Sequence, residues 1–332
     1  MNDSTIFQCA LDNPRRKVPQ ARGLASTRST VPPLKIGTRG SKLALIQAHR
    51  IQELMQAANP LLQSEIVIIR TEGDIDKTTP LHELGGKGAF VKNIEVALAE
   101  GVIDVGVHSL KDITSKPLDG LELVAFLKPE AVNDALLLAF PFRTLAELPP
   151  GSTLATGSLR RKALLTRLRP DLRLVDIRGN VPTRVNRLRK GDFDGLVLSV
   201  AGLIRLGLDN QIAYSFKPHE FCPAPGQGVI ALQVRQNDDR VRNLCLPIND
   251  PIQFIKSTTE LAFLETLQFD CHAPLGGYAN LRGQQIDLQV FASNASFDQF
   301  FDQHFHFSLD VRLQEARKAA LEVMQWIARH EH

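Results

Sequence analysis

Four polar side chains with the means for proton transfer and ion binding follow one apolar strand pattern. They are His108, Ser109, Lys111 and Asp112, which supply an imidazole, a hydroxyl, an ammonium and a carboxylate. Such groups act as general acids and bases when a fold holds them beside a reacting atom. A plainer interpretation is a solvated turn in which Asp112 pairs with Lys111 or caps a helix, since aspartate is common in turns. From these residues alone, both interpretations stay open.

The strand that precedes these side chains is indicated by its alternation. Ile103, Val105 and Val107 alternate with Asp104 and Gly106, which is the period of a strand. In an α/β sheet, ligands bind in the crevice outside the carboxyl ends of the strands. A buried strand that ends at residue 108 would therefore place the four polar side chains where chemistry takes place.

The first part of the chain alternates strand and helix patterns. Strands are predicted over 34–37, 65–70 and 103–107, and helices after Ser41 and over 90–100, where Ser41 is an N-cap and Gly101 ends the second helix. This β-α-β-α-β order predicts a doubly wound parallel sheet. Residues 71–88 form a long polar segment with several glycines, and segments of that length are usually functional or mobile.

A second α/β unit is indicated from residue 133, with strands that end near residues 156, 177 and 200. Residues 223–228 are rich in proline and glycine and predict a crossover, after which a strand over 229–234 returns to the first sheet. From about residue 250, a helix, a strand over 286–292 and a helix over 310–329 follow. The predicted fold class is α/β, with two doubly wound domains, a double crossover and a small α+β C-terminal domain. The predicted bounds are a tail over 1–33, then domains over 34–128 plus 228–246, 133–222 and 250–332.

Basic residues dominate the stretch from 158 to 190. Arg160, Arg178 and Arg184 fall at or just after strand ends or helix starts, where helix N-termini favour anions and guanidinium groups suit carboxylate or phosphate. A solvated basic surface, a nucleic-acid site and a site for a small polycarboxylate or phosphate are the three interpretations. The stretch lacks the interleaved aromatic residues on which nucleic-acid bases stack, and its placement favours a small polyanion.

The composition is that of an ordinary globular protein of 332 residues with a formal net charge of +3. No apolar run approaches the roughly 20 residues of a transmembrane helix. The four cysteines show no metal-ligand spacing, so we expect a cytoplasmic protein without a metal site. Residues 1–33 lack sustained periodicity and indicate a disordered tail. A transit peptide is the alternative, which Asp3 and Asp12 oppose because such peptides are poor in acids.

From about residue 34 to the C-terminus, ordered motifs give the chain a family likeness. They are Thr38-Arg39-Gly40-Ser41, Gly73-Asp74, Gly85-Gly86-Lys87-Gly88, Val107-His108-Ser109-Leu110-Lys111-Asp112, Ser158-Leu159-Arg160-Arg161, Arg178-Gly179-Asn180 with Thr183-Arg184, Ala201-Gly202-Leu203 with Arg205, Gly226-Gln227-Gly228, and Cys271 with Pro274-Leu275-Gly276. In type and order these motifs resemble porphobilinogen deaminase (hydroxymethylbilane synthase).

The resemblance implies three domains around a cleft, the first two similar to periplasmic anion-binding proteins. It implies a dipyrromethane cofactor attached through a thioether to Cys271. The implied reaction of tetrapyrrole and heme biosynthesis adds four porphobilinogen units head to tail with loss of ammonia, and hydrolysis then releases hydroxymethylbilane. The expected partner is this small-molecule substrate, bound by a monomer, with no nucleic acid and no membrane.

The resemblance also implies roles for residues. Asp112 matches the family's catalytic carboxylate, and Lys111 stands beside it. A carboxylate near the pyrrole N–H stabilises the cationic azafulvene that deamination generates, and it moves protons. The residues matched to cofactor and substrate binding, besides Cys271, are Arg39, Ser41, Gln47, Asp74, Lys87, Ser109, Ser158, Arg160, Arg161, Arg178, Arg184 and Arg205. Cys222 matches no role and is expected to be a buried thiol.

The sequence departs from the family pattern at a few positions. Phe269-Asp270 stands before Cys271 where the family usually has two glycines, and Asp270 disfavours a thiolate beside it. Leu261 replaces a usual arginine, Glu83 a usual basic residue, and residues 129–133 lack the arginines common at that hinge. Fewer positive charges would hold a growing polycarboxylate. The alternative function is therefore a divergent member that binds pyrroles or other anions without completing the tetramer.

Overall fold

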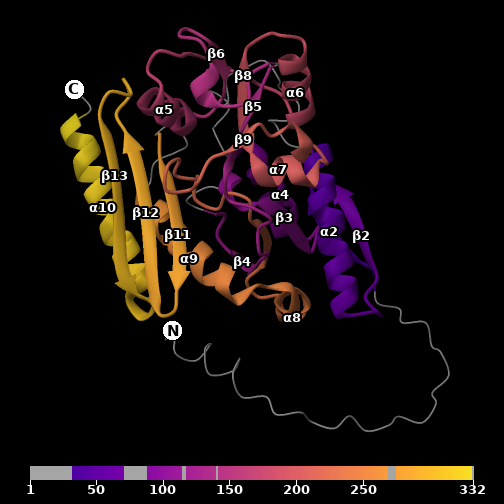
Figure 1. Ribbon diagram of the computed structural model, residues 1–332. Helices are drawn as coiled ribbons and strands as arrows, with labels where there is room; N and C mark the ends of the chain where they lie inside the picture. Colours follow the sequence, from indigo (N-terminus) through magenta and orange to yellow (C-terminus); the bar gives the residue numbers. More distant parts are fainter. Residues whose placement is uncertain (1–31, 71–87, 114–116, 140, 268–273, 331–332) are drawn as a thin grey trace, which may run out of the picture. The chain divides into compact units, whose positions relative to one another are not determined.

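The computed structural model describes residues 32–70, 88–113, 117–139, 141–267 and 274–330 (Figure 1). Asp74, Lys87, Cys271 and the predicted N-terminal tail up to residue 31 lie outside the described residues. So do Glu83 and Phe269-Asp270, which depart from the family pattern.

The first sheet has five strands in the order β2-β1-β3-β10-β4. Its strands are β1 (Leu34–Thr38), β2 (Ser64–Ile68), β3 (Val105–Ser109), β4 (Leu121–Phe126) and β10 (Ile230–Arg235). The first three are parallel neighbours, linked through α2 (Lys42–Ala58) and α4 (Gly88–Ala99), which confirms the predicted β-α-β-α-β order. Strand β10 runs antiparallel to β3 and β4, so the sheet is mixed and not wholly parallel as predicted, because the returning strand enters it in the opposite direction.

Local sequence explains where these helices begin and end. The Ser41 hydroxyl accepts a hydrogen bond from the backbone N–H of Ala44 and so caps α2, as predicted. Apolar residues at helical spacing, among them Ala48, Ile51 and Met55, turn one face of α2 to the core. After α4 the chain turns at Gly101 with a φ of +71°, a conformation that glycine adopts without strain.

The second sheet has the order β7-β6-β8-β5-β9. Its strands are β5 (Asp134–Leu138), β6 (Thr153–Ala155), β7 (Arg173–Val175), β8 (Gly195–Ser199) and β9 (Tyr214–Ser215). Three helices follow β6, β7 and β8 in turn, namely α5 (Leu159–Leu168), α6 (Val181–Arg189) and α7 (Val200–Arg205). Strands β6, β7 and β8 are parallel neighbours, whereas β5 is antiparallel to β8.

The chain passes between these two sheets twice. The first crossover, residues 127–133, leads from β4 to β5, and the second crossover, residues 216–229, leads from β9 back to β10. The predicted return of the chain to the first sheet is therefore confirmed. The strands that follow the two crossovers, β5 and β10, each run antiparallel to both of their neighbours.

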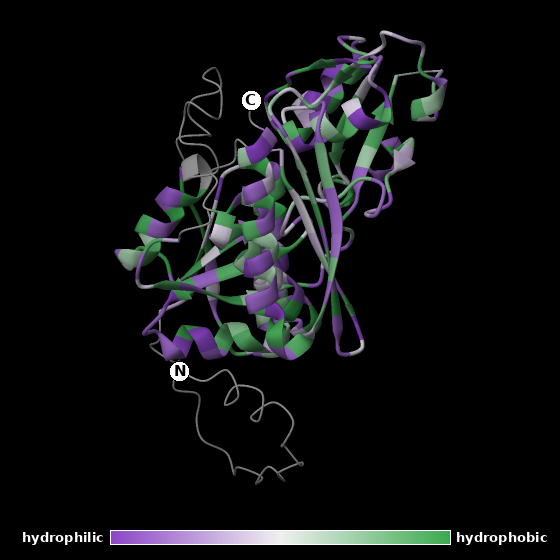
Figure 2. Ribbon diagram, turned by 90° about the vertical axis from the view of Figure 1, so that its left-hand side faces the viewer, coloured by the Kyte–Doolittle hydropathy of each residue, from purple (hydrophilic) through white to green (hydrophobic). Residues whose placement is uncertain are grey.

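The third sheet is an antiparallel meander of β11 (Gly276–Arg282), β12 (Gln285–Ser293) and β13 (Phe300–Ser308). The helices α9 (Pro251–Leu267) and α10 (Arg312–His330) share an apolar cluster with it. The buried residues of α10 recur at helical spacing, and its ribbon alternates hydrophilic and hydrophobic colours (Figure 2). Strands β11 and β13 were absent from the prediction. The exposed polar positions of β13 weaken its apolar signal.

Together these elements confirm the predicted fold class of α/β with a double crossover and a small α+β C-terminal part. Among the described helices, none combines the length and apolar character that crossing a membrane requires.

Candidate functional site

Strand β3 leads directly into a single turn of 3-10 helix, Leu110–Asp112, at the carboxyl end of the first sheet. Leu110 is buried and packs with Ile113 in an apolar cluster, which holds the turn against the strand. Asp112 is consequently fixed at the edge where parallel strands leave room for a ligand.

A cavity of about 70 Å³ opens at this edge. Its lining combines the carboxyl end of β3, the start of α2 and one face of α4. The polar residues that line it are Arg39, Ser41, Gln47, His108, Ser109 and Asp112. Five of these six are site residues that the sequence predicted, and the fold brings them together from segments about 70 positions apart. We call this cavity the Asp112 pocket.

Hydrogen bonds fix two of the lining side chains. Gln47 is 3% exposed, and its amide nitrogen donates to the Ser109 hydroxyl over 3.1 Å. This bond ties α2 to the end of β3. Asp112, by contrast, forms no side-chain hydrogen bond or ion pair within the described part of the chain, and it caps no helix there. The solvated-turn interpretation, with Asp112 paired to Lys111, is not the arrangement seen here, because the carboxylate lines a cavity instead.

Lys111 lies between this pocket and the basic residues of α5. Burial lowers the pKa of its ammonium to about 8, and the positive charges of Arg161 and Arg160 add to the effect. The negative charges of Asp112 and Asp134 oppose it. An amine with a pKa near 8 exchanges protons readily close to neutral pH, as an acid–base residue must.

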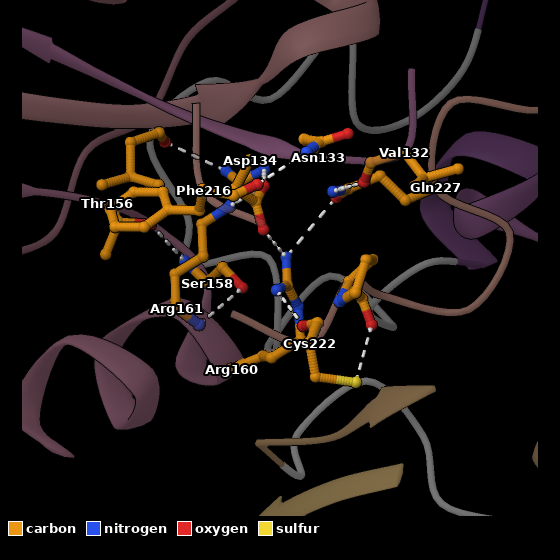
Figure 3. A network of polar contacts seen from close by, with 12 residues as sticks. Val132, Asn133, Asp134, Thr156, Ser158, Arg160, Arg161, Phe216, Cys222 and Gln227 are labelled. Carbon is orange, nitrogen blue, oxygen red and sulfur yellow. Dashed lines mark hydrogen bonds and ion pairs between the residues drawn. The ribbon is translucent and has the colours of Figure 1, made fainter. Parts of the chain in front are cut away.

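A buried ionic network occupies the start of α5 (Figure 3). Asp134 is fully buried at the start of β5 and faces two guanidinium groups. Arg161 donates to Asp134 Oδ1 over 2.6 and 2.9 Å, and a nitrogen of Arg160 lies 2.8 Å from Oδ2. Burial alone would raise the pKa of Asp134, but Arg160 and Arg161 hold it below its ordinary value.

The same network reaches both crossovers. Arg160 donates to the backbone carbonyl of Cys222 over 2.6 Å, and the amide nitrogen of Gln227 donates to the carbonyl of Val132 over 2.7 Å. Arg160 is 5% exposed and Arg161 is 7% exposed. Their side chains are therefore engaged within the protein, and their predicted contact with ligand carboxylates stays a prediction.

Arg205 has a similar position at the end of α7. It pairs with Glu130 of the first crossover at 2.6 Å and donates to the carbonyl of Gly228 in the second. A residue predicted to bind ligand thus links the two crossovers to each other. Its predicted role as a ligand contact is not tested by this arrangement.

Arg184 is the clearest cationic site of the second sheet. Its Nε donates to the carbonyl of Gly179 over 2.7 Å, and among the described residues it has no carboxylate partner. Burial and, to a smaller extent, the like charges of Arg161 and Arg178 together lower the pKa of Arg184 to about 10. Ser158 caps the N-terminus of α5 beside this group. A buried guanidinium with no carboxylate partner among the described residues favours an anionic ligand.

The described cysteines do not offer a reactive thiol. Cys222 is 1% exposed, as predicted, and burial raises the pKa of its thiol strongly. Burial also raises the pKa of Cys245 to about 12. A thiol that stays protonated is a poor nucleophile. Within the described ranges, no group of His, Cys, Asp and Glu residues is arranged to hold a metal ion.

Sequence reasoning missed the acidic and amide partners of the basic residues, namely Asp134, Glu130 and Gln227. Asp134 reads only as the first residue of an apolar strand, and Gln227 stands inside a glycine motif whose residues were not assigned roles. Their pairing depends on the path of the two crossovers, which no local pattern encodes.

Comparison with known proteins shows a match to one protein family. A family model described as "porphobilinogen deaminase, dipyromethane cofactor binding domain" matches residues 34–243.

Three solved structures are similar in part of the fold. A TRAP periplasmic solute-binding protein from Desulfovibrio salexigens is 14% identical, covers 65% of this chain and 72% of its own, and has a TM-score of 0.39. An arginine-specific periplasmic binding protein from Salmonella typhimurium is 12% identical, with 66% and 92% covered and a TM-score of 0.38. A Bordetella pertussis extracytoplasmic solute receptor that binds pyroglutamic acid is 12% identical, with 66% and 77% covered and a TM-score of 0.36.

Proposed function

Because this chain belongs to the porphobilinogen deaminase family, we propose that it condenses four porphobilinogen units head to tail, with release of ammonia, to give hydroxymethylbilane. The reaction would start on a dipyrromethane primer attached to Cys271. The family match supports a role in tetrapyrrole biosynthesis.

The observation that carries the proposal is the Asp112 pocket. A carboxylate without a protein partner in the described structure lines a small polar cavity at the carboxyl end of β3. Loss of ammonia from porphobilinogen leaves a cationic azafulvene, which a nearby negative charge stabilises. Asp112 would provide that charge and accept the proton that a pyrrole loses when the new bond has formed.

Lys111 would donate a proton to the departing amine. With a pKa lowered to about 8 by its surroundings, its ammonium can deliver a proton near neutral pH and recover it afterwards. Ser41, Gln47 and Ser109 would orient the pyrrole ring, because they line the pocket with donors and acceptors.

The cationic sites fit a substrate that carries acetate and propionate groups. Arg39 lines the Asp112 pocket, and Arg184 lies among positive charges without a carboxylate partner in the described structure. Arg178 and the capped N-terminus of α5 add to the same positive region. These groups would bind the carboxylates of substrate and primer.

The chain's own residues also bear on the cofactor. When bound, a dipyrromethane supplies a nucleophilic pyrrole carbon from which the chain of rings grows. Buried, protonated thiols at Cys222 and Cys245 are unsuited to attach it, which is consistent with attachment at Cys271, the cysteine that the resemblance implies. The pocket's mixture of carboxylate, hydroxyl, amide and guanidinium groups suits pyrrole N–H groups and carboxylates alike.

Intact mass of the purified protein, followed by a bilane assay, tests the proposal. A dipyrromethane adduct together with hydroxymethylbilane formation from porphobilinogen is the expected result. An adduct without bilane would instead support the divergent member that binds pyrroles but does not complete the tetramer. A bare polypeptide that neither binds nor consumes porphobilinogen would refute both.

A further inference from the structure

Three buried polar side chains lie behind the Asp112 pocket, and the proposed reaction gives none of them a role. They are His108 on β3, Gln233 on β10 and Glu95 on α4, with exposed fractions of 4%, 0% and 6%. Burying such groups costs free energy unless they satisfy one another or a ligand. Their arrangement should therefore have a purpose beyond packing.

Gly106 is the residue next to which both His108 and Gln233 lie. Gln233 is the cross-strand partner of Gly106, and His108 Nε2 lies 3.0 Å from the place that a Cβ on Gly106 would take. On the helix side, Ile94 and Leu98 come within 2.9 and 3.0 Å of that same place. A glycine is needed here because the imidazole and α4 fill the space that a side chain would occupy.

The three side chains follow one another inward from the pocket. His108 lines the pocket and contacts Gln233, whose amide nitrogen donates to Glu95 Oε1 over 2.9 Å. A carboxylate accepts, so the Gln233 nitrogen must face Glu95 and its Oε1 must face elsewhere. Within the described structure, Gln233 Oε1 and His108 Nε2 are both buried, and neither has a hydrogen-bond partner. The two atoms can satisfy each other only if Nε2 carries the proton.

This tautomer determines which nitrogen of His108 can accept a hydrogen bond. A neutral imidazole with the proton on Nε2 has a lone pair on Nδ1, which accepts hydrogen bonds. Burial lowers the pKa of His108 to about 4, while the contact with Gln233 and the charge of Asp112 oppose that shift. A neutral ring does not form an ion pair with Asp112, so the carboxylate keeps its charge for a cationic ligand.

We infer that His108 is a binding residue of the Asp112 pocket, locked in the Nε2–H tautomer by Gln233 and Glu95, and that its Nδ1 accepts an N–H of the bound substrate. The donor is a pyrrole N–H or the aminomethyl group, and Gln233 and Glu95 are positioning residues. This inference rests on the proposed function, because it takes porphobilinogen as the ligand.

The tautomer is measured first, in the protein without substrate. ¹⁵N-labelled protein gives the ring-nitrogen signals of its histidines, and His108→Gln identifies the signal of residue 108. We expect the Nε2–H tautomer, unprotonated from pH 8 down to pH 5. Glu95→Gln lets the Gln233 amide turn and should give a mixture of tautomers, whereas His49→Gln on the exposed side of α2 should change nothing. A signal from the Nδ1–H tautomer, or one unaffected by Glu95→Gln, would overturn the lock.

Substrate binding is measured next. Porphobilinogen should shift the Nδ1 signal of His108 in the wild type, and His108→Gln and Glu95→Gln should raise KM by about tenfold, the worth of one hydrogen bond. A purely structural role would lower the melting temperature of Glu95→Gln and leave KM and the tautomer unchanged. A wild type that shows the tautomer and the shift but makes no bilane defeats the proposed function and not the inference. A wild type that makes bilane with an unshifted Nδ1 signal defeats the inference alone.

Discussion

A carboxylate that follows a buried strand can cap a turn or face a cavity, and the surroundings of Asp112 decide between the two. Leu110 and Ile113 anchor the turn in the apolar cluster on either side of it, so Asp112 is held in place without a polar partner of its own among the described residues. Its charge is therefore available to a ligand. Lys111, the adjacent residue, is tuned by burial and by the charges of α5.

At this scale the sharpest change is Asp112→Asn. The amide has nearly the shape of the carboxylate and no structural partner to lose, so the melting temperature should stay within a few degrees of the wild type. Turnover should fall by about 10²-fold or more, because an amide neither offsets a cation nor takes a proton. Bilane formation is measured under saturating porphobilinogen, with Asp119→Asn on the exposed loop before β4 as the control. A near-normal rate would remove Asp112 from the mechanism.

Cys271→Ser addresses the attachment site. A hydroxyl is a far weaker nucleophile than a thiolate, so the adduct and its Ehrlich-positive colour should both disappear. Cys222→Ser is the matched control, and its adduct should persist because that thiol is buried and protonated. Intact mass decides the matter. An adduct on the Cys271→Ser protein would show that attachment takes place elsewhere.

At the scale of elements, the start of α5 is held in place by buried ion pairs. Two adjacent arginines in its first turn would be costly to bury without a counterion. The fold places Asp134 of β5 between them, and the carbonyls of Val197 and Cys222 accept one further hydrogen bond each. The position of α5 against β5 and the second crossover is thereby defined.

Asp134→Asn should show how much these ion pairs contribute to the free energy of unfolding. Removing one partner of a buried ion pair costs about 3–5 kcal/mol, which urea denaturation at pH 7 would report. Asp176→Asn, at an ion pair whose carboxylate is 75% exposed, should cost less than about 1 kcal/mol.

The pH dependence has a definite sign. Because the pKa of Asp134 in the fold is below its ordinary value of 3.8, its contribution is complete above that value and is lost as the pH falls through the lowered pKa. The difference between wild type and Asp134→Asn should thus be constant from pH 7 to pH 5 and shrink below about pH 4. A difference that grows in acid would contradict this account.

At the scale of the whole molecule, arginines expected to bind ligand also link the two crossovers. Arg160 contacts the second crossover, Gln227 joins it to the first, and Arg205 contacts both through Glu130 and Gly228. Ligand carboxylates and these internal acceptors would compete for the same cations. Binding of a growing polycarboxylate would then be coupled to the segments that connect the sheets.

Leu261 belongs to this scale, because it connects α9 with the turn that carries Asp112. Leu261 on α9 packs in the apolar cluster of Leu110 and Ile113, behind Asp112. An apolar contact thus stands where the resemblance implies a cation. If the missing charge matters, complexes with one or two added pyrroles should accumulate at limiting porphobilinogen, since each unit adds two carboxylates.

Leu261→Arg should relieve this accumulation, and Leu261→Met, which keeps the volume without a charge, should not. Mass spectrometry of the enzyme complexes after a limiting dose of porphobilinogen gives the distribution. A charge-assisted hydrogen bond of roughly 1.5–3 kcal/mol implies a late step about tenfold slower or more without it. An even distribution with prompt bilane release, unchanged by Leu261→Arg, would mean that other basic residues such as Lys128 compensate.

The sequence by itself determined the features that depend on short-range pattern. Alternation identified β3 and the polar turn after it, Ser41 and Gly101 marked helix ends, and the strand–helix order predicted two α/β sheets and the return of β10, although not its antiparallel direction. Each of these follows from periodicity or from a residue's own backbone and capping preference. The ordered motifs also identified the family and the residues of the Asp112 pocket.

Only the tertiary structure decided which charges meet. That Asp134 lies between Arg160 and Arg161, or that Gln233 separates His108 from Glu95, depends on contacts between residues 26 to 138 positions apart in the chain. A side chain's partners, burial and protonation are set by the neighbours that folding brings to it, and no local pattern encodes them. For that reason the sequence named the basic residues of the site, while the fold showed which of them already have an internal counterion.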